Sequence, residues 1–215
     1  MSIKAVIFDL DGVIVSTDNY HYRAWKKISD EEGIYFDRKI NERLRGVSRM
    51  ESLDIILEKA NREYSQEEKN SFAERKNSLY RNLLEELTQN DILPGVMRVL
   101  EILKKNDIKV AIGSSSKNTE FILRKIGLHE YFDAISDGTQ IKNSKPDPEV
   151  FLVAAKKLCI EPRDCLVVED ADAGVEAGLA GGMKVLAVGY ASRNRKANLR
   201  MESLEQFKYE DMITV

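Results

Sequence analysis

The feature of this sequence that most constrains its fold is a series of short apolar runs separated by longer segments of helical periodicity. The apolar runs lie at residues 3–8, 108–112, 132–135, 165–168 and 183–188. The segments with apolar residues at helical spacing lie at residues 96–105, 117–126, 148–158 and 171–180. Strands that are apolar throughout and alternate with helices are typical of a parallel sheet buried between two layers of helices. The pattern therefore predicts an α/β fold.

A helical insertion interrupts this alternation after the first apolar run. Over residues 18–89 the strand signals are replaced by charged amphipathic segments with apolar side chains at helical spacing. Pro94-Gly95 then marks a turn from which the next core helix starts. We therefore expect two units, a core formed by residues 1–17 and 90–215 and an inserted helical unit formed by residues 18–89.

The charge and composition of the chain exclude several classes of protein. The 33 lysines and arginines are scattered among 36 aspartates and glutamates, which leaves no basic stripe for a nucleic acid. The apolar run at the N-terminus is too short for a signal peptide or a membrane span, and Asp9 interrupts it. We expect a monomeric cytoplasmic protein with neither nucleic-acid nor membrane partners, in which Cys159 and Cys165 are free packing thiols.

Two pairs of carboxylates follow apolar runs of the predicted sheet. Asp9 and Asp11 come directly after the first run, and side chains two apart on an extended chain project to the same side. Glu169-Asp170 follows another run and would lie at the same edge of the sheet, where open α/β sheets bind their ligands. Carboxylates this close together need a counter-charge, and oxygen-only ligands favour Mg²⁺. Taken alone, each pair could instead be loop acids that cap a helix.

Hydroxyl groups and a lysine follow two further strands. Ser114-Ser115-Ser116-Lys117-Asn118 comes after the second apolar run and leads into a predicted helix, where hydroxyls and free amide groups suit a phosphate. A serine-rich helix N-cap explains the same residues, and the local sequence does not separate the two interpretations. Lys145 stands just ahead of a helix whose start Pro146 and Pro148 fix, and by itself it would be an ordinary surface lysine.

The combination of these groups, each at the end of its own strand or connection, favours phosphoryl transfer. The Asp9 carboxylate can take up a phosphoryl group as an aspartyl phosphate while Mg²⁺ and Lys145 neutralise the developing charge. Asp11 is placed to exchange a proton with the attacking or leaving hydroxyl. The sequence therefore predicts a magnesium-dependent phosphotransferase with Asp9, Asp11, Ser114 and Lys145 as catalytic residues.

In this order the four motifs resemble those of the haloacid-dehalogenase superfamily. The matching positions are Asp9-x-Asp11, Ser114, Lys145 and Glu169-Asp170. The resemblance implies a Rossmann-like parallel-sheet core with an inserted α-helical cap domain, and a phosphoenzyme at Asp9. It also implies one Mg²⁺ per chain, held by the Asp9 carboxylate, the backbone carbonyl of Asp11 and the Asp170 carboxylate, with Glu169 close by.

Over almost the whole chain the sequence resembles the β-phosphoglucomutase family. The stretches that carry this resemblance are His21-Tyr22-Arg23-Ala24-Trp25-Lys26, Leu44-Arg45-Gly46-Val47-Ser48-Arg49, Arg75-Lys76-Asn77, Ser114-Ser115-Ser116-Lys117-Asn118 and Ser144-Lys145-Pro146. The resemblance implies interconversion of β-D-glucose 1-phosphate and β-D-glucose 6-phosphate, with β-glucose 1,6-bisphosphate as the intermediate and activator. It implies that Arg49, from the cap, clamps the distal phosphate.

The same resemblance implies a set of substrate contacts shared between the cap and the core. The candidate substrate-binding residues are His21, Trp25, Gly46, Val47, Ser48, Arg49, Lys76, Ser115, Ser116, Lys117 and Asn118. Trp25 also fits a packing role on an amphipathic helix, and His21 and Lys76 also fit a hinge histidine and a solvated lysine. The sequence departs from the family at Val15-Ser16-Thr17, where many relatives carry an acid, at Arg45, where lysine is usual, and at Ser115, where alanine is usual.

Two other functions share these motifs. A capped sugar-phosphate phosphatase of the same superfamily would use the same four motifs but admit water to the phosphoaspartate. Arg49 and Lys117-Asn118 favour a mutase over it, because they supply a second phosphate site. A non-catalytic phospho-acceptor module resembling a response-regulator receiver also combines acids, a hydroxyl and a lysine on a parallel sheet. The long helical insertion argues against it.

Overall fold

The core of the molecule is a parallel six-stranded sheet, and the computed structural model describes it within residues 3–213. Residues 1, 2, 214 and 215 of the predicted core lie outside that range. The strands are β1 (Ala5–Phe8), β2 (Lys109–Gly113), β3 (Ala134–Ser136), β4 (Cys165–Glu169), β5 (Lys184–Ala187) and β6 (Leu199–Arg200). They lie in the order β3-β2-β1-β4-β5-β6. The chain therefore steps outward from β1 to β3 and then crosses to the other side of β1, which creates a switch point between β1 and β4.

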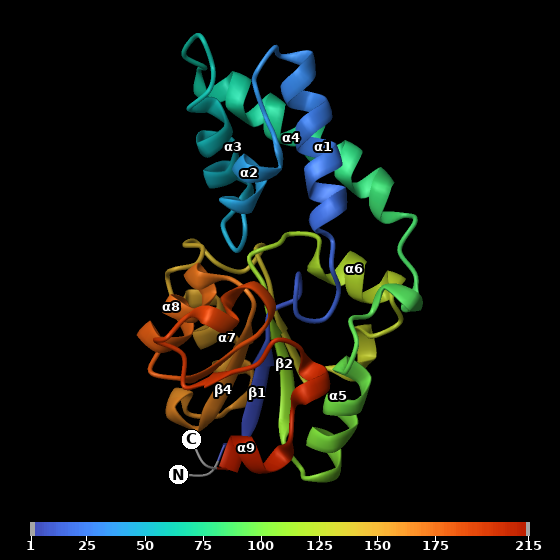
Figure 1. Cartoon of the computed structure of the whole chain (residues 1–215), viewed down its shortest axis with the longest axis vertical. Coiled ribbons are helices and arrows are strands. Elements are labelled where there is room, and N and C mark those ends of the chain that lie inside the picture. The colour runs from blue at the N-terminus through green and yellow to red at the C-terminus, as the bar shows by residue number, and fades with distance from the viewer. Residues whose placement is uncertain (1–2, 214–215) are drawn as a thin grey trace.

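Helices cover both faces of this sheet (Figure 1). They are α5 (Val96–Lys105), α6 (Thr119–Lys125), α7 (Glu149–Leu158) and α8 (Asp172–Ala180), followed at the C-terminal end by α9 (Tyr209–Ile213). On β1, Val6 and Phe8 belong to a buried cluster with α5 and α6, while Ala5 and Ile7 pack with α7 and α8. Alternate side chains thus enter opposite layers, and the predicted α/β fold with a Rossmann-like core is confirmed.

Short 3₁₀ helices connect many of these elements. They are η1 (Gln89–Asp91), η2 (His129–Tyr131), η3 (Pro162–Asp164), η4 (Gly189–Arg193) and η5 (Leu204–Gln206). The strand β6 was not predicted, because two residues at the edge of the sheet carry no apolar run. Among residues 3–213, no helix combines the length and the apolar character needed to cross a membrane.

Four helices inserted after β1 form a separate layer, which we call the cap and which stands over one end of the sheet in Figure 1. They are α1 (Asp18–Glu31), α2 (Arg38–Glu42), α3 (Arg49–Leu57) and α4 (Gln66–Leu84). The cap has its own buried cluster, which includes Trp25, Phe36 and Phe72. Ser48 and Ser65 begin α3 and α4 with reciprocal capping boxes. Sharp helix starts of this kind hold the turn before α3 in place.

Candidate active site

The end of β1 places two carboxylates at the switch point of the sheet. The Asp9 amide donates to the Val168 carbonyl at 2.9 Å, which continues the β1–β4 pairing by one residue. The chain then doubles back at Gly12, whose φ is +87°. A Cβ at that position would lie 2.1 Å from the nearer carboxylate oxygen of Asp170. Gly12 is therefore required both by its backbone conformation and by the closeness of β1 and β4 at this edge.

Lys145 is the cation at the centre of the core acids. Its ammonium group donates to Asp9 Oδ1 and to Glu169 Oε1, both at 2.5 Å, and the lysine side chain is only 1% exposed. Burial lowers the pKa of Lys145, but the carboxylates of Asp9 and Glu169 together outweigh it and raise that pKa above its ordinary value. Lys145 is thus a permanent charge that fixes one oxygen of Asp9. Within residues 3–213, the other Asp9 oxygen accepts no side-chain hydrogen bond.

The remaining core acids form an oxygen-only cluster. One carboxylate oxygen each from Asp9, Glu169 and Asp170 lies within 4.8 Å of the others. Burial and then neighbouring carboxylates raise the pKa of Asp170 to about 9. The pKa of Glu169 is raised to about 7, mainly by burial. These buried carboxylates would otherwise have to bind protons to reduce their mutual repulsion. A hard divalent cation would neutralise them instead, and the oxygen-only donor set fits Mg²⁺.

Asp11 is held by the hinge between the core and the cap. Its two carboxylate oxygens accept from the Thr17 amide at 2.6 Å and from the Thr17 hydroxyl at 2.7 Å. The Asp11 side chain is 36% exposed, but it faces the space beneath the cap rather than bulk water. Burial therefore raises its pKa to about 6 against the lowering effect of the two Thr17 bonds. A carboxyl group with this pKa can take up and release a proton near neutral pH.

The serine segment after β2 is a turn that precedes its helix. The Ser116 amide donates to Ser114 Oγ at 3.2 Å, and the Asn118 amide donates to Ser116 Oγ at 3.2 Å. Helix α6 begins at Thr119, so the predicted start at residue 117 was two residues early. The hydroxyl of Ser115 is buried without a hydrogen-bond partner among the described residues. The turn therefore carries a hydroxyl group, that of Ser115, without a hydrogen-bond partner among the described residues.

Helices α1 and α4 of the cap bring a second group of cations over the same edge. Lys76 Nζ lies 2.7 Å from His21 Nδ1 and stacks over the rings of Trp25 and Tyr80, at 4.7 and 4.4 Å from their centroids. Burial, reinforced by Arg49, lowers the pKa of Lys76 well below its ordinary value. The pKa of His21 is also lowered well below its ordinary value, by burial and then by Lys76 and Arg49. Neither Lys76 nor Arg49 forms an ion pair within residues 3–213.

A polar bridge joins the cap to the serine turn. Arg49 Nη2 donates to Asn77 Oδ1 at 2.7 Å, and the Asn118 side chain donates to the same oxygen at 3.0 Å. Sequence analysis did not assign a role to Asn77. Together with Lys76 and Tyr80 it lies on one face of α4, because residues three and four apart on a helix are neighbours. That spacing was the available signal for Asn77 and Tyr80.

A single cavity of about 590 Å³ unites these groups between the cap and the core. The predicted residues that line it are Asp9, Asp11, His21, Trp25, Gly46, Val47, Ser48, Arg49, Lys76, Ser114, Ser115, Ser116, Lys117, Asn118, Lys145 and Asp170. Glu169 is the one predicted residue outside this lining; it is fully buried and lies behind Lys145, to which it is bonded. Gly174 explains the tight fit around Glu169, because a Cβ on Gly174 would lie 1.9 Å from the Glu169 carboxylate.

The sequence of the chain matches the family model of the haloacid dehalogenase-like hydrolases over residues 3–182. The chain belongs to this family. It is 47% identical to the β-phosphoglucomutase of Bacillus subtilis (strain 168) over 189 residues, which cover 87% of this chain and 84% of that protein. It is 32% identical to a phosphorylated carbohydrates phosphatase of Thermotoga maritima over 216 residues, with 99% and 98% of the two chains covered.

The fold of this family member is shared with solved structures over nearly its whole length. A crystal structure of β-phosphoglucomutase from Clostridium difficile superimposes with a TM-score of 0.92 at 48% sequence identity. The match covers 97% of this chain and 94% of that one. The agreement includes both the sheet and the inserted helices, so the cap is a part of the fold that the two chains have in common.

Proposed function

We propose that the enzyme is a β-phosphoglucomutase, an isomerase that interconverts β-D-glucose 1-phosphate and β-D-glucose 6-phosphate through β-glucose 1,6-bisphosphate. The observation that carries this proposal is the charge of the cavity, which has an acidic floor in the core that fits a metal and, in the cap, two cations without ion pairs among the described residues, Lys76 and Arg49. A sugar with a phosphate at each end satisfies both. The similarity to β-phosphoglucomutases supports the same substrate.

In the first half-reaction the free oxygen of Asp9 attacks one phosphorus of β-glucose 1,6-bisphosphate, in line with the sugar oxygen, and glucose 6-phosphate is the leaving group. The bond from phosphorus to the sugar oxygen breaks, and the departing oxygen takes the proton of Asp11. Lys145 orients Asp9 through its hydrogen bond to Oδ1. A magnesium ion bound by Asp9, Asp170 and the Asp11 carbonyl, with Glu169 close by, would neutralise charge on the transferring phosphoryl group.

The second half-reaction transfers the phosphoryl group from Asp9 to the free 6-hydroxyl of β-glucose 1-phosphate, which forms the bisphosphate. Asp11 now accepts the proton of the attacking hydroxyl, while the bond between phosphorus and Asp9 breaks. The bisphosphate must then turn end for end, so that Asp9 takes up its other phosphoryl group and glucose 6-phosphate is released. We assign Arg49 and Lys117-Asn118 to the phosphate that is not reacting, because they lie in the cavity and Asn77 holds Arg49 beside Asn118. Ser114, beside them, would hold the reacting phosphate.

The cap domain, residues 18–89, would exclude water from the phosphoaspartate when it closes over the core, residues 1–17 and 90–215. His21, Trp25 and Lys76 would line its inner wall, and Gly46, Val47 and Ser48 would contact the sugar from the turn before α3. A phosphatase has less need of a cap that excludes water and of a second phosphate site. The Thermotoga maritima relative, however, is a phosphatase. Phosphatase activity is therefore the alternative that an experiment must separate from the mutase reaction. The monomeric state stays a prediction.

The test follows the products by phosphorus NMR. The protein is incubated with Mg²⁺ and β-glucose 1-phosphate, with a trace of β-glucose 1,6-bisphosphate and, as the control, without it. Conversion to glucose 6-phosphate that accelerates with the bisphosphate is the expected result. Inorganic phosphate as the main product would overturn the mutase proposal and leave the phosphatase in its place.

A further inference from the structure

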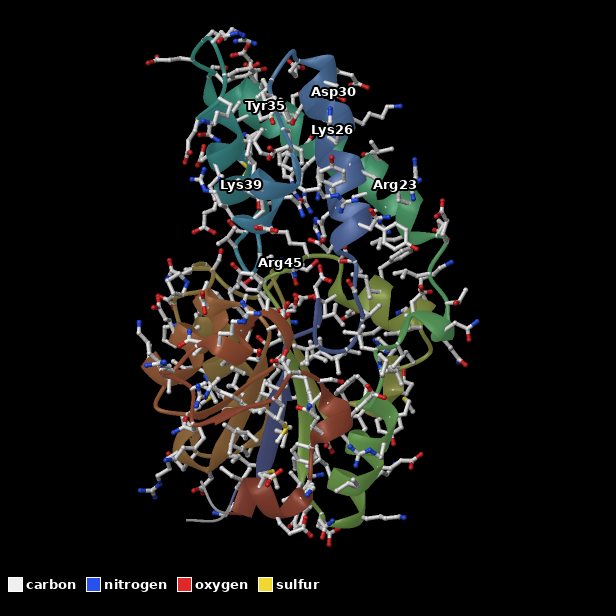
Figure 2. All side chains as sticks on the ribbon, viewed as in Figure 1. Arg23, Lys26, Asp30, Tyr35, Lys39 and Arg45 are labelled. Carbon is white, nitrogen blue, oxygen red and sulfur yellow. The ribbon has the colours of Figure 1, made fainter. Side chains whose placement is uncertain are left out.

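Arg45 reaches from the cap to a carboxylate of the core. It lies in the turn between α2 and α3, at the junction where Figure 2 labels it. One guanidinium nitrogen lies 3.5 Å from Asp18 Oδ2 at the start of α1, and another lies 3.5 Å from Asp170 Oδ2. Asp170 is one of the three acids of the predicted cation site. The cap therefore already supplies a cation to that site.

The surroundings of Arg45 hold its turn against the core. The adjacent Gly46 has a φ of +75°, and a Cβ there would lie 3.1 Å from the Ala171 methyl group, so the turn packs against the segment that enters α8. The guanidinium carbon lies 5.7 Å from the ring centroid of Tyr190, a side chain that is 58% exposed. Arg45 Nε is buried without a partner among the described residues. Arg45 lines the cavity, and one of its donors has no acceptor among the described residues.

Arg45 and a bound divalent cation must share the Asp170 carboxylate. Two positive charges on one buried acid repel each other, and the low dielectric of the site makes the repulsion larger than in water. A phosphoryl group in the cavity removes this conflict, because its oxygens can accept from the free Arg45 donor and bind the cation at the same time. The conflict is therefore present in the empty enzyme and absent when a phosphate is bound.

We propose that Arg45 is a positioning residue that couples the cap to the cation site through Asp170. In the absence of phosphate, the Arg45–Asp170 contact weakens cation binding, and by linkage the cation loosens the contact of the cap with the core. When phosphate is bound, the Arg45–Asp170 contact and the bound cation can be present together. The closed and metal-loaded state is therefore reached only with substrate present. The inference rests on the metal site of the proposed function and is independent of which sugar is turned over.

The first test compares Mg²⁺ affinity by isothermal titration calorimetry in wild type, Arg45→Ala, Arg45→Lys and Arg43→Ala. Arg43 is the matched control, because it lies two residues away on the same cap segment and pairs with Glu58 at the surface. We expect Arg45→Ala to bind Mg²⁺ about tenfold more tightly, within the usual range of coupling between sites. Arg45→Lys should remain near the wild-type affinity, and Arg43→Ala should match it. Unchanged or weaker binding in Arg45→Ala would overturn the proposal.

The second test repeats these titrations with saturating inorganic phosphate. The Mg²⁺ affinity of Arg45→Ala should then exceed that of wild type by less than about twofold, since phosphate offsets the repulsion between Arg45 and Mg²⁺ at Asp170. An advantage that persists unchanged would contradict the role of phosphate. Wild-type protein that binds no Mg²⁺ at all would instead refute the metal site of the proposed function, so the two failures are distinguishable.

The third test measures the distance between cap and core by energy transfer between two dyes. The exposed native Cys159 carries one dye, and Tyr35→Cys, at a cap position that is 65% exposed, carries the other. Cys165 should not react, because it is buried and burial raises the pKa of its thiol to about 11. Mg²⁺ should lengthen the distance in the phosphate-free enzyme that keeps Arg45 and leave it unchanged in Arg45→Ala. Equal responses in both would speak against the coupling.

Discussion

The core and the cap contribute opposite charge to the cavity they share. The core brings Asp9, Asp11, Glu169 and Asp170 around one lysine, and burial raises the pKa of three of these acids. From the cap, Arg49 and Lys76 have no carboxylate within salt-bridge distance among residues 3–213, and burial lowers their pKa values. In each half, buried charge is therefore left unneutralised until a ligand of the opposite charge binds.

The difference shows how each half is stabilised. In the core, Lys145 bonds to two carboxylates and is part of the structure. In the cap, Lys76 lies on aromatic rings and beside a histidine, with no carboxylate to neutralise it. Its positive charge therefore does not stabilise the fold and is available to a ligand. Sites that hold uncompensated charge commonly trade stability for function. The predictions below test this contrast, from the largest expected effect to the smallest.

Asp9→Asn should abolish turnover. The amide cannot form the aspartyl phosphate, and loss of a covalent nucleophile commonly lowers the rate by about 10⁴-fold or more. The mutase assay by phosphorus NMR measures the loss, with circular dichroism as the control for folding. A folded Asp9→Asn protein with more than a few per cent of wild-type activity would refute the covalent scheme.

Lys145→Met should destabilise the protein. Asp9 and Glu169 would be left buried without their cation, and breaking a buried ion pair by removing one partner costs about 3–5 kcal/mol. Urea unfolding in EDTA measures the free energy of unfolding without interference from a metal. A free energy of unfolding within 1 kcal/mol of wild type would mean that the core acids do not depend on this lysine, roughly the threshold set by ordinary surface changes.

Arg49→Ala should separate the two phosphate sites. Removing the cap clamp on the distal phosphate should lower mutase turnover by about 100-fold, in line with the loss of a charged contact in a buried site. Release of inorganic phosphate from the phosphoenzyme should change much less, because water needs no distal clamp. The ratio of glucose 6-phosphate to inorganic phosphate is the measurement. An equal loss of both activities would remove the assigned role of Arg49.

Lys76→Met should change the free energy of unfolding in the opposite direction to Lys145→Met. Methionine retains contact with Trp25 and Tyr80 without a desolvated charge, so we expect the free energy of unfolding to rise by about 1 kcal/mol. Mutase turnover should fall in the same variant, because a cation of the cavity is lost. Urea unfolding of Lys76→Met and Lys145→Met, side by side, provides the comparison. Destabilisation of both would mean that Lys76 is a structural cation like Lys145.

Much of the core was predictable because its signals are local. Apolar runs predicted the strands, and α5 begins and ends at the predicted residues because Gly95 precedes it in a left-handed conformation and its apolar spacing is regular. The edge strand β6 carried no such signal. Parallel topology brings the motifs at the ends of β1, β2 and β4 to one edge, whereas the order of the strands came only from the structure.

The cap was predictable as helices but not as a set of contacts. Its apolar spacing shows which face of each helix is buried, whereas the distance from a cap side chain to the core depends on how the cap is placed over the sheet. The bond of Asn118 to Asn77 and the ion pair of Arg45 with Asp170 span that interface. No periodicity in the chain encodes them, and family resemblance had marked Arg45 only as a departure.

The sequence by itself determined which groups gather at one edge of the sheet, because Asp9, Asp11, Lys145 and Glu169-Asp170 each follow a strand or connection whose direction the fold fixes. Only the tertiary structure decided the environment of those groups. Side chains distant in sequence share one buried space, and burial there raises the pKa of acids in the core and lowers the pKa of cations in the cap. Charge that would be harmless on an isolated helix is unfavourable in that space, and the proposed function neutralises it with a metal ion and the phosphates of the substrate.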